Sequence, residues 1–182
     1  MKYQITEIAS LLQVPLKCLS DKKSTISALL TDSRSLTYPA ETLFFALKTK
    51  SNDGHHYIAP LYERGVRNFV VDNLRCVPRE YRNANFLVVD DTRKALQATA
   101  TYHRRKFEIP VIGITGSKGK TTLKERLNQL LAADFNIIRS PRSYNSQIGV
   151  PLSLWEIDTN TSLAIIEAGI SRPNEMVTLQ AM

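Results

Sequence analysis

Val111-Ile-Gly-Ile-Thr-Gly-Ser-Lys-Gly-Lys-Thr-Thr122 is the stretch that decides the fold of this 182-residue chain. An apolar strand pattern breaks into glycines, and a helix start follows at Lys-Thr-Thr. Glycines let backbone N–H groups converge on phosphate oxygens, and the helix presents its positive end to the same place. The stretch therefore predicts a phosphate-binding loop for a nucleoside triphosphate, with a plain turn between strand and helix as the alternative.

The loop also carries side chains suited to a triphosphate. Lys120 can reach the outer phosphates, and the Thr121 hydroxyl can hold Mg²⁺. The predicted contacts to ATP come from Gly116, Ser117, Lys118, Gly119, Lys120, Thr121 and Thr122. The glycine spacing departs from the general P-loop, because Ile114 stands five positions before Gly119. The stretch resembles instead the ATP loop of the Mur ligase family, whose ATP-dependent members add amino acids to the peptidoglycan precursor.

Composition narrows the class of protein. Hydrophobic residues make up 43% of the chain, and no apolar run is long enough to span a bilayer. The N-terminus lacks the apolar stretch of a secretory signal, so we expect a soluble, cytoplasmic protein without a membrane partner. Cys18 and Cys76 form no CxxC pair and predict no metal centre.

The net charge of +7 raises the question of nucleic acid, since His103-Arg-Arg-Lys106 is a dense basic cluster. These residues close a helical pattern, where cations complement the negative helix end. The chain also lacks the interleaved aromatic and basic residues of a base-stacking platform. We therefore expect no nucleic-acid partner.

Pro110 divides the chain, because proline disfavours helix at the preceding residue and an apolar strand starts directly after it. We predict an α/β fold with two domains, 1–108 and 109–182. In the first domain we predict helices at 5–12, 56–64 and 92–107, and strands at 26–31, 43–47, 68–71 and 86–89. In the second we predict strands at 111–115, 136–139 and 163–167, helices at 121–133 and 148–155, and a further helix under way near the end.

The second domain has the strand, loop and helix order of a doubly wound nucleotide-binding sheet. It offers only three predicted strands, whereas such sheets usually carry about five or six. We therefore expect the first part of an ATP-binding domain, truncated, with the C-terminal part of the same ligase missing.

The first domain carries Thr31-Asp-Ser-Arg34, and Asn52-Asp-Gly-His55 follows further along the chain. This pair of motifs resembles the UDP-binding domain of the Mur ligases. By that resemblance Ser33 and Arg34, with Lys50, Ser51 and Asn52, would bind the UDP of the substrate. Arginine offers a fork to diphosphate oxygens, which suits the assignment. The alternative is an ordinary Asx-type turn with a surface arginine.

Arg142-Ser-Tyr-Asn-Ser-Gln-Ile-Gly-Val-Pro151 resembles a segment of the family members that add D-alanyl-D-alanine. By that resemblance Asn145 would lie near the ATP, where its amide can donate to an oxyanion. The alternative is a helix start with Ser or Asn as the N-cap and Pro151 in the first turn. Both interpretations can hold together.

Leu163-Ala-Ile-Ile-Glu167 reads as a buried strand that delivers one carboxylate at its carboxyl end. An unpaired buried carboxylate costs several kcal/mol, so Glu167 needs a partner, and a metal is the natural one beside a triphosphate. We predict Thr121 and Glu167 as Mg²⁺ ligands, as the family resemblance also implies. The alternative is a Glu167 that pairs with an arginine or faces solvent.

The resemblance covers the whole chain and implies an acid-amino acid ligase. ATP would phosphorylate the terminal carboxylate of UDP-N-acetylmuramoyl-tripeptide, and the amine of D-alanyl-D-alanine would attack the acyl phosphate. Lys120 and Glu167 are the predicted catalytic residues. The pattern also resembles the ligase half of ligase–alanine racemase fusions. Alternatives are a third-residue-adding ligase, a folylpolyglutamate synthase and a non-catalytic nucleotide-binding module. We expect the 182-residue chain to be inactive by itself.

Overall fold

The computed structural model describes residues 1–49, 51–73, 80–81 and 83–182. The chain forms two compact units, Met1–Leu96 (unit 1) and Gln97–Met182 (unit 2). This division falls inside helix α3 (Thr92–Arg104), whereas the predicted domain boundary follows that helix. The assignment of domains to 1–108 and 109–182 stays a prediction.

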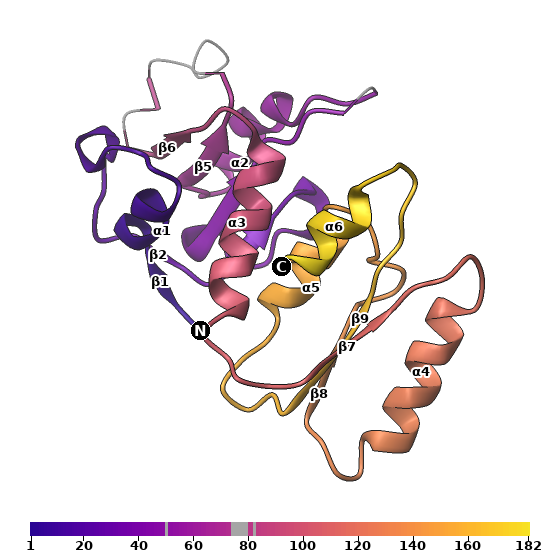
Figure 1. Cartoon of the computed structure of the whole chain (residues 1–182). Coiled ribbons are helices and arrows are strands. Elements are labelled where there is room, and N and C mark those ends of the chain that lie inside the picture. The colour runs from indigo at the N-terminus through magenta and orange to yellow at the C-terminus, as the bar shows by residue number, and fades with distance from the viewer. Residues whose placement is uncertain (50, 74–79, 82) are drawn as a thin grey trace. The chain divides into compact units, whose positions relative to one another are not determined.

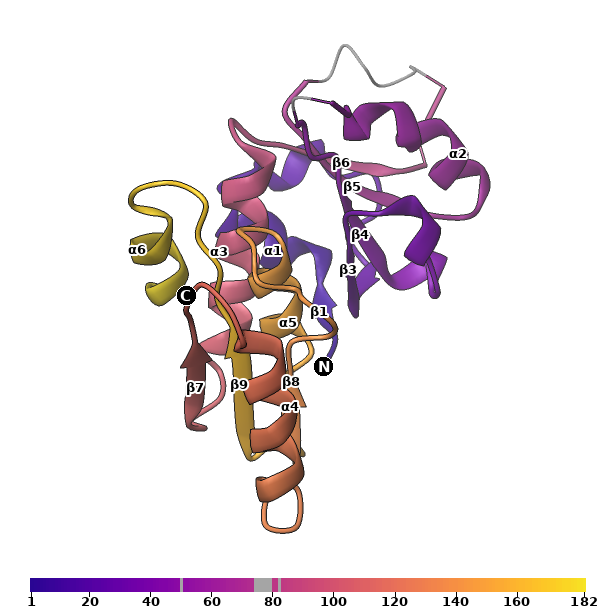
Figure 2. The ribbon, with the colours of Figure 1, turned by 90° about the vertical axis from the view of Figure 1, so that its right-hand side faces the viewer.

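Unit 1 contains a four-stranded parallel sheet in the order β3-β4-β5-β6, seen edge-on beside α2 (Ile58–Glu63) in Figure 2. The strands are β3 (Ala28–Leu30), β4 (Thr42–Phe45), β5 (Asn68–Val71) and β6 (Asn85–Val88). Ile58 and Leu61 of α2 pack with Phe44 and Phe69 in one core cluster. Alternate strand residues face the other side and are also fully buried, as Phe45 and Val70 are. Both faces of this sheet are therefore covered.

A second, two-stranded sheet joins the start of the chain to a later strand. β1 (Tyr3–Gln4) pairs antiparallel with β2 (Thr25–Ile26), and α1 (Ile5–Leu11) follows β1 directly. The single strand predicted over 26–31 is therefore wrong. The chain leaves one sheet after Ile26 and joins the other at Ala28, because the backbone N–H of Ser27 between them donates to the Glu41 carbonyl oxygen at 2.9 Å.

Unit 2 contains a three-stranded parallel sheet in the order β7-β9-β8 (Figure 1). Its strands are β7 (Val111–Ile114), β8 (Ile137–Arg139) and β9 (Leu163–Glu167). Helix α4 (Lys120–Leu131) packs Leu127 and Leu131 on one face, and α5 (Gly149–Trp155) with α6 (Glu175–Gln180) covers the other. This arrangement confirms the α/β class with helices on both faces of a parallel sheet.

The remaining elements follow their predicted places with small shifts at the ends. Helix α3 ends at Arg104 rather than at Phe107, because the backbone N–H groups of Lys106 and Phe107 donate to residues three rather than four positions earlier. The Arg104 guanidinium reaches forward to the carbonyl oxygens of Phe107 and Ile109. Its start is set by Asp91, whose Oδ1 accepts the backbone N–H groups of Arg93 and Lys94. Within the described residues, none of the helices is long and apolar enough to cross a membrane.

Candidate phosphate and precursor sites

The predicted phosphate loop connects β7 to α4. Gly116 and Gly119 adopt φ angles of 139° and 80°, which side chains other than glycine rarely tolerate. The Lys120 ammonium donates to the Gly116 carbonyl oxygen at 2.6 Å and so lies back across the loop. Ser117 and Lys118 are exposed. The backbone thus forms a glycine turn at the positive end of a twelve-residue helix, which is compatible with phosphate binding, and the individual contacts to ATP stay predictions.

Glu167 stands beside this loop because β9 pairs with β7 in parallel, with Glu167 in register with Ile114. The Glu167 side chain is only 1% exposed. Its Oε2 accepts from the Thr121 hydroxyl at 2.9 Å, and its Oε1 accepts from the Asn145 amide at 2.8 Å. The Ser140 hydroxyl accepts the backbone N–H of Glu167 at 2.9 Å. Three segments distant in sequence therefore meet at one carboxylate.

Lys124 adds a positive charge to this cluster. Its side chain is fully buried, and its Nζ lies 3.6 Å from Glu167 Oε2 and donates to the Ser140 carbonyl oxygen at 2.7 Å. From the sequence, Glu167 was expected to have a metal as its partner, with an arginine or solvent as the alternative, and its burial excludes solvent. The structure supplies protein partners instead, and the cation is a lysine from α4. The assignment of Glu167 to Mg²⁺ stays a prediction that no longer follows from the need for a partner.

The donor atoms nevertheless fit a magnesium ion that is shared with phosphate. The Thr121 hydroxyl and the Glu167 carboxylate offer the hard oxygen ligands that Mg²⁺ prefers, and the Ser143 hydroxyl lies 3.5 Å from the Thr121 hydroxyl. No cluster of three or more His, Cys, Asp or Glu suited to a metal occurs in the described part of the chain. The described side chains therefore do not supply a full set of metal ligands by themselves. Mg²⁺ commonly takes one or two carboxylates, water and substrate phosphates.

Asn145 lies in the turn between β8 and α5. Its Nδ2 donates to Glu167, whereas the sequence predicted donation to a phosphate oxygen. The amide group has a second N–H, so the two roles are compatible. The alternative role, a helix start, is present in part, because α5 begins directly after this turn with Pro151 in its first turn. Its N-cap is Ile148 rather than a serine or asparagine, and the Ser146 hydroxyl accepts the backbone N–H groups of Ile148 and Gly149 from ahead of the cap. Thr122 is exposed on α4.

Gly149 and Gly169 hold this turn in place through close approach. A Cβ on Gly149 would lie 2.7 Å from the Tyr144 carbonyl carbon, and one on Gly169 would lie 3.0 Å from Asn145 Cγ. The Gly169 backbone N–H also donates to the Asn145 carbonyl oxygen at 2.7 Å. Asn145 is therefore positioned by backbone packing that larger residues at these two places would disturb.

The predicted UDP residues of unit 1 lie after neighbouring parallel strands. β3 and β4 are hydrogen-bonded neighbours, so the segments that follow them start from the same edge of the sheet. Ser33 and Arg34 begin a 3-10 helix after β3, and the Asp32 side chain accepts the Arg34 backbone N–H at 3.0 Å. Asp32 thus forms the Asx-type turn that the sequence offered as the alternative.

The Arg34 guanidinium already has a carboxylate partner. Its Nη2 donates to Asp32 Oδ2 at 2.7 Å and its Nε to Asp32 Oδ1 at 2.9 Å. These hydrogen bonds hold the pKa of Asp32 below its ordinary value. The Arg34 side chain is 87% exposed, so solvent and ligands can reach it. A diphosphate at Arg34 would have to share or displace Asp32.

The loop after β4 contains Ser51 and Asn52, both exposed. The Asn52 side chain accepts from the Tyr57 hydroxyl at 3.2 Å. Asp53 accepts the His55 backbone N–H at 3.0 Å and pairs with the His55 ring at 2.7 Å, which accounts for Asp-Gly-His as a local structural turn. Lys50 lies outside the described residues. Ser33, Arg34, Ser51 and Asn52 as UDP contacts stay predictions.

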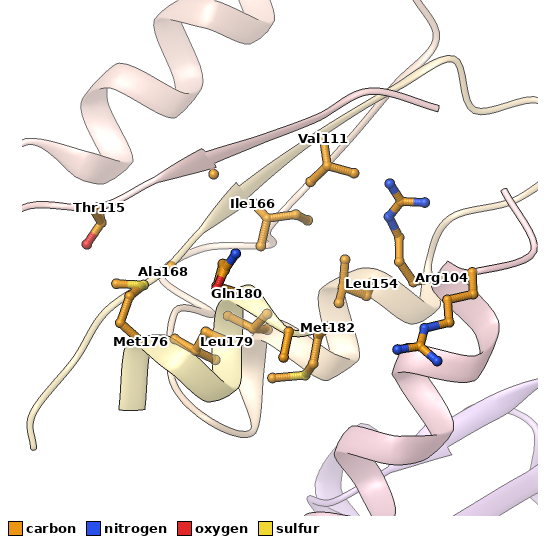
Figure 3. A pocket seen from close by; sticks show the side chains of 14 residues that line it. Arg104, Val111, Thr115, Leu154, Ile166, Ala168, Met176, Leu179, Gln180 and Met182 are labelled. Carbon is orange, nitrogen blue, oxygen red and sulfur yellow. The ribbon is translucent and has the colours of Figure 1, made fainter. Parts of the chain in front are cut away.

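A cavity of about 570 Å³ lies in unit 2 between α6 and the sheet (Figure 3). Its lining is largely apolar and includes Val111, Leu154, Ile166, Met176, Leu179 and Met182. Thr115 of the phosphate loop reaches its edge, but Lys120 and Glu167 are not among the described residues that line it. The cavity is therefore separate from the predicted phosphate contacts.

Comparison with known proteins places this geometry in a family. Residues 114–182, which contain the phosphate loop, the Asn145 turn and Glu167, match the family described as the Mur ligase middle domain. This segment belongs to the Mur ligases. The sequence resemblance to that family is thereby confirmed.

The similarity of this chain to individual relatives extends beyond residues 114–182 and includes unit 1. The UDP-N-acetylmuramoyl-tripeptide--D-alanyl-D-alanine ligase of Bacillus subtilis is 31% identical over 182 residues, which is 100% of this chain and 39% of that protein. The ligase of the same name from Haemophilus influenzae is 33% identical over 183 residues, covering 97% of this chain and 38% of the relative. The chain thus spans about two fifths of the length of these relatives.

Solved structures agree with the sequence matches. A crystal structure of MurF from Acinetobacter baumannii superposes with a TM-score of 0.82 at 27% identity, covering 98% of this chain and 38% of that one. The MurF ligase from Thermotoga maritima in complex with ADP gives a TM-score of 0.71 at 26% identity, covering 84% and 34%. The Mur ligase fold therefore extends over both units of the chain.

Lys124 and Ser140 were not predicted from the sequence, although Lys124 lies 3.6 Å from the Glu167 carboxylate and the Ser140 hydroxyl accepts the Glu167 backbone N–H. Lys124 follows Lys120 by one helical turn, and lysines on a helix are usually exposed. A short serine after β8 carries no distinctive signal either. Only the packing of α4 against the end of β9 reveals their part.

Proposed function

We propose that the chain is the precursor-binding unit and the phosphate-loop part of an ATP-dependent ligase that adds D-alanyl-D-alanine to UDP-N-acetylmuramoyl-tripeptide. One observation carries the proposal: the Thr121 hydroxyl of the phosphate loop donates to Glu167 Oε2 at 2.9 Å, beside the Asn145 amide. Similarity over the full chain to ligases of that name supports this specificity. The relatives are more than twice as long as the match, so the activity is proposed for the whole protein.

In the proposed reaction, the loop residues bind and orient a triphosphate. The backbone N–H groups around Gly116 and Gly119 and the start of α4 would hold phosphate oxygens, and Lys120 would leave the Gly116 carbonyl to reach them. Thr121 and Glu167 would hold Mg²⁺, which would offset negative charge on the phosphate. Catalysis here is mainly positioning and electrostatic stabilisation, because no side chain has to act as a nucleophile.

Unit 1 would bind the UDP end of the acceptor. Arg34 is exposed at the end of β3 and presents a guanidinium suited to a diphosphate, while Asp32 holds it in place until the ligand competes. The acceptor carboxylate would then be phosphorylated by ATP. The amine of D-alanyl-D-alanine would attack the acyl phosphate and release phosphate, so that one amide bond forms for each ATP consumed.

Calorimetric titration of the 182-residue chain with UDP, UDP-N-acetylmuramoyl-tripeptide and Mg-ATP tests the proposal. We expect Arg34→Ala to weaken binding of the two UDP ligands and Lys120→Ala to weaken Mg-ATP, each without effect on the other ligand. Arg126→Ala, which removes an exposed arginine from α4, is the matched control for charge. A folded chain that binds no UDP ligand would contradict the precursor-ligase function. Binding of ATP alone would leave the non-catalytic nucleotide-binding module.

A substrate panel on the longer protein separates the rival ligases. We expect amide formation only with D-alanyl-D-alanine and the UDP-linked tripeptide. Activity with a free amino acid on a UDP-linked dipeptide would favour a third-residue-adding ligase, and activity on folate would favour a folylpolyglutamate synthase. We further predict that the 182-residue chain does not ligate by itself, and ATP-dependent ligation by it would contradict this.

A further inference from the structure

Lys124 has no part in the proposed phosphate contacts, yet it is a fully buried cation. Its Nζ donates to the carbonyl oxygens of Ser140 and Arg142. The same atom lies 3.6 Å from Glu167 Oε2 and 3.5 Å from Glu125 Oε1. A buried ammonium is costly unless its donors and its charge are matched, so these contacts hold it in one place. Lys124 is therefore a fixed positive charge beside Glu167.

The ammonium acts on Glu167 by charge rather than by a hydrogen bond. The 3.6 Å separation is too long for a normal N–H···O bond, and Glu167 Oε2 instead accepts from the Thr121 hydroxyl at 2.9 Å. Glu125 shares the ammonium but is 43% exposed, so water screens it. The charge of Lys124 therefore bears mainly on the buried carboxylate.

We propose that Lys124 is a built-in counter-ion that makes divalent-metal binding at Glu167 depend on nucleotide phosphate. The inference rests on the proposed function for the nature of the site. A metal ion at Glu167 would be repelled by the nearby ammonium, and in a water-poor site this repulsion is strong. The negative oxygens of a triphosphate offset it. Metal alone then binds weakly, and metal with nucleotide binds well. Lys124 is a positioning residue, because it acts through Glu167.

The test measures Mn²⁺ binding to the 182-residue chain without nucleotide, by electron paramagnetic resonance of free Mn²⁺. Lys124→Met replaces the ammonium by an uncharged side chain of similar length. We expect the wild type to bind Mn²⁺ weakly and Lys124→Met to bind it about tenfold more tightly or better, from removal of one nearby charge. The gain should vanish in the double variant Lys124→Met/Glu167→Gln. Glu125→Gln is the matched control and should change Mn²⁺ affinity little.

If Lys124 only stabilises the fold, its replacement should not increase the affinity for Mn²⁺. A folded Lys124→Met with unchanged or weaker Mn²⁺ affinity would overturn the inference, and thermal unfolding of each variant establishes that it is folded. Lys124→Gln, which keeps an N–H donor without the charge, replaces the Met variant if that variant does not fold. The wild-type chain also tests the inference without any Lys124 variant. If it binds Mn²⁺ tightly in the absence of nucleotide, and Glu167→Gln removes this binding, the inference is contradicted.

A failure of the proposed function can be distinguished from a failure of the inference about Lys124. The Mn²⁺ titrations contain no nucleotide, whereas the proposed function requires Mg-ATP binding by the wild type. A folded wild type that binds no Mg-ATP removes the function, even if Lys124→Met gains Mn²⁺ affinity. A wild type that binds Mg-ATP, with no gain in the Met variant, keeps the function and removes the role of Lys124.

Discussion

Each unit has an ion pair near the carboxyl ends of its parallel strands, and the two pairs are built in opposite ways. In unit 1, Arg34 and Asp32 stand two positions apart, and the Arg34 side chain is 87% exposed. In unit 2, Lys124 and Glu167 come from α4 and β9, and their side chains are 0% and 1% exposed. The first pair forms from sequence neighbours in water. The second exists only because the fold removes water from both charges, so it responds far more strongly to change.

Glu167→Gln should produce the largest effect. It leaves the buried Lys124 ammonium without its carboxylate, and we expect the free energy of unfolding to fall by about 3 to 5 kcal/mol. Urea unfolding of the 182-residue chain measures it. Arg34→Ala is the counterpart in unit 1 and should leave the unfolding midpoint unchanged. Equal effects of the two substitutions would break the comparison.

The buried His103 of unit 2 should make the free energy of unfolding depend on pH in the acid range. Burial lowers the pKa of His103 from its ordinary value of 6.5 to about 4, although a hydrogen bond to the Ile157 carbonyl oxygen opposes the shift. Between these values the unfolded chain binds the proton and the native chain does not. The free energy of unfolding therefore falls by about 3 kcal/mol as the pH drops from about 6.5 to about 4.

Urea unfolding at several pH values checks the His103 contribution. His103→Gln should flatten the pH dependence in this range, because it removes the titrating ring. His56→Gln, at an exposed histidine of unit 1, is the matched control and should leave the dependence as it is. An unchanged slope in His103→Gln would show that other groups produce the acid effect.

Gly149→Ala should follow in size. The added Cβ would meet the Tyr144 backbone at 2.7 Å, so the turn that carries Asn145 must shift, at a cost of about 1 to 3 kcal/mol. We also expect weaker Mg-ATP binding. Gly113→Ala serves as the control, because a Cβ added there would meet no atom of the described residues within 4 Å apart from its chain neighbours. Similar stability of both variants would mean that the turn relaxes freely.

Asp32→Ala should have the smallest effect on stability. It removes the acceptor for the Arg34 backbone N–H at 3.0 Å, and capping bonds at exposed turns are worth about 0.5 to 1 kcal/mol. The same change frees the Arg34 guanidinium, so we expect UDP to bind more tightly, by calorimetry. Weaker UDP binding would indicate instead that Asp32 must hold Arg34 in position.

Most elements of the fold followed from sequence periodicity, and the misses have a common cause. Strands such as β5 and β9 are mostly apolar, with one polar residue at an end of each, and α4 follows directly from the glycine loop. The break at Ser27 could not be predicted, because it depends on β1, a strand of two residues without a pattern of its own. The end of α3 was misplaced because the turn at Lys106 and Phe107, with hydrogen bonds to His103 and Arg104, carries no glycine or proline to mark it.

The sequence by itself determined the glycine turn between β7 and α4 and the strand that ends in Glu167, and it offered the Asx turn before Arg34 as an alternative. Each of these depends on residues within about a dozen positions, where glycine conformation, apolar runs and local hydrogen bonds act. Tertiary structure alone decided what partners Glu167. The β7-β9-β8 strand order places this carboxylate beside α4, where Thr121 and Lys124 reach it from one helix and Asn145 from another segment. Charge pairing in a buried site depends on exclusion of water, and that exclusion exists only after the helices cover the sheet.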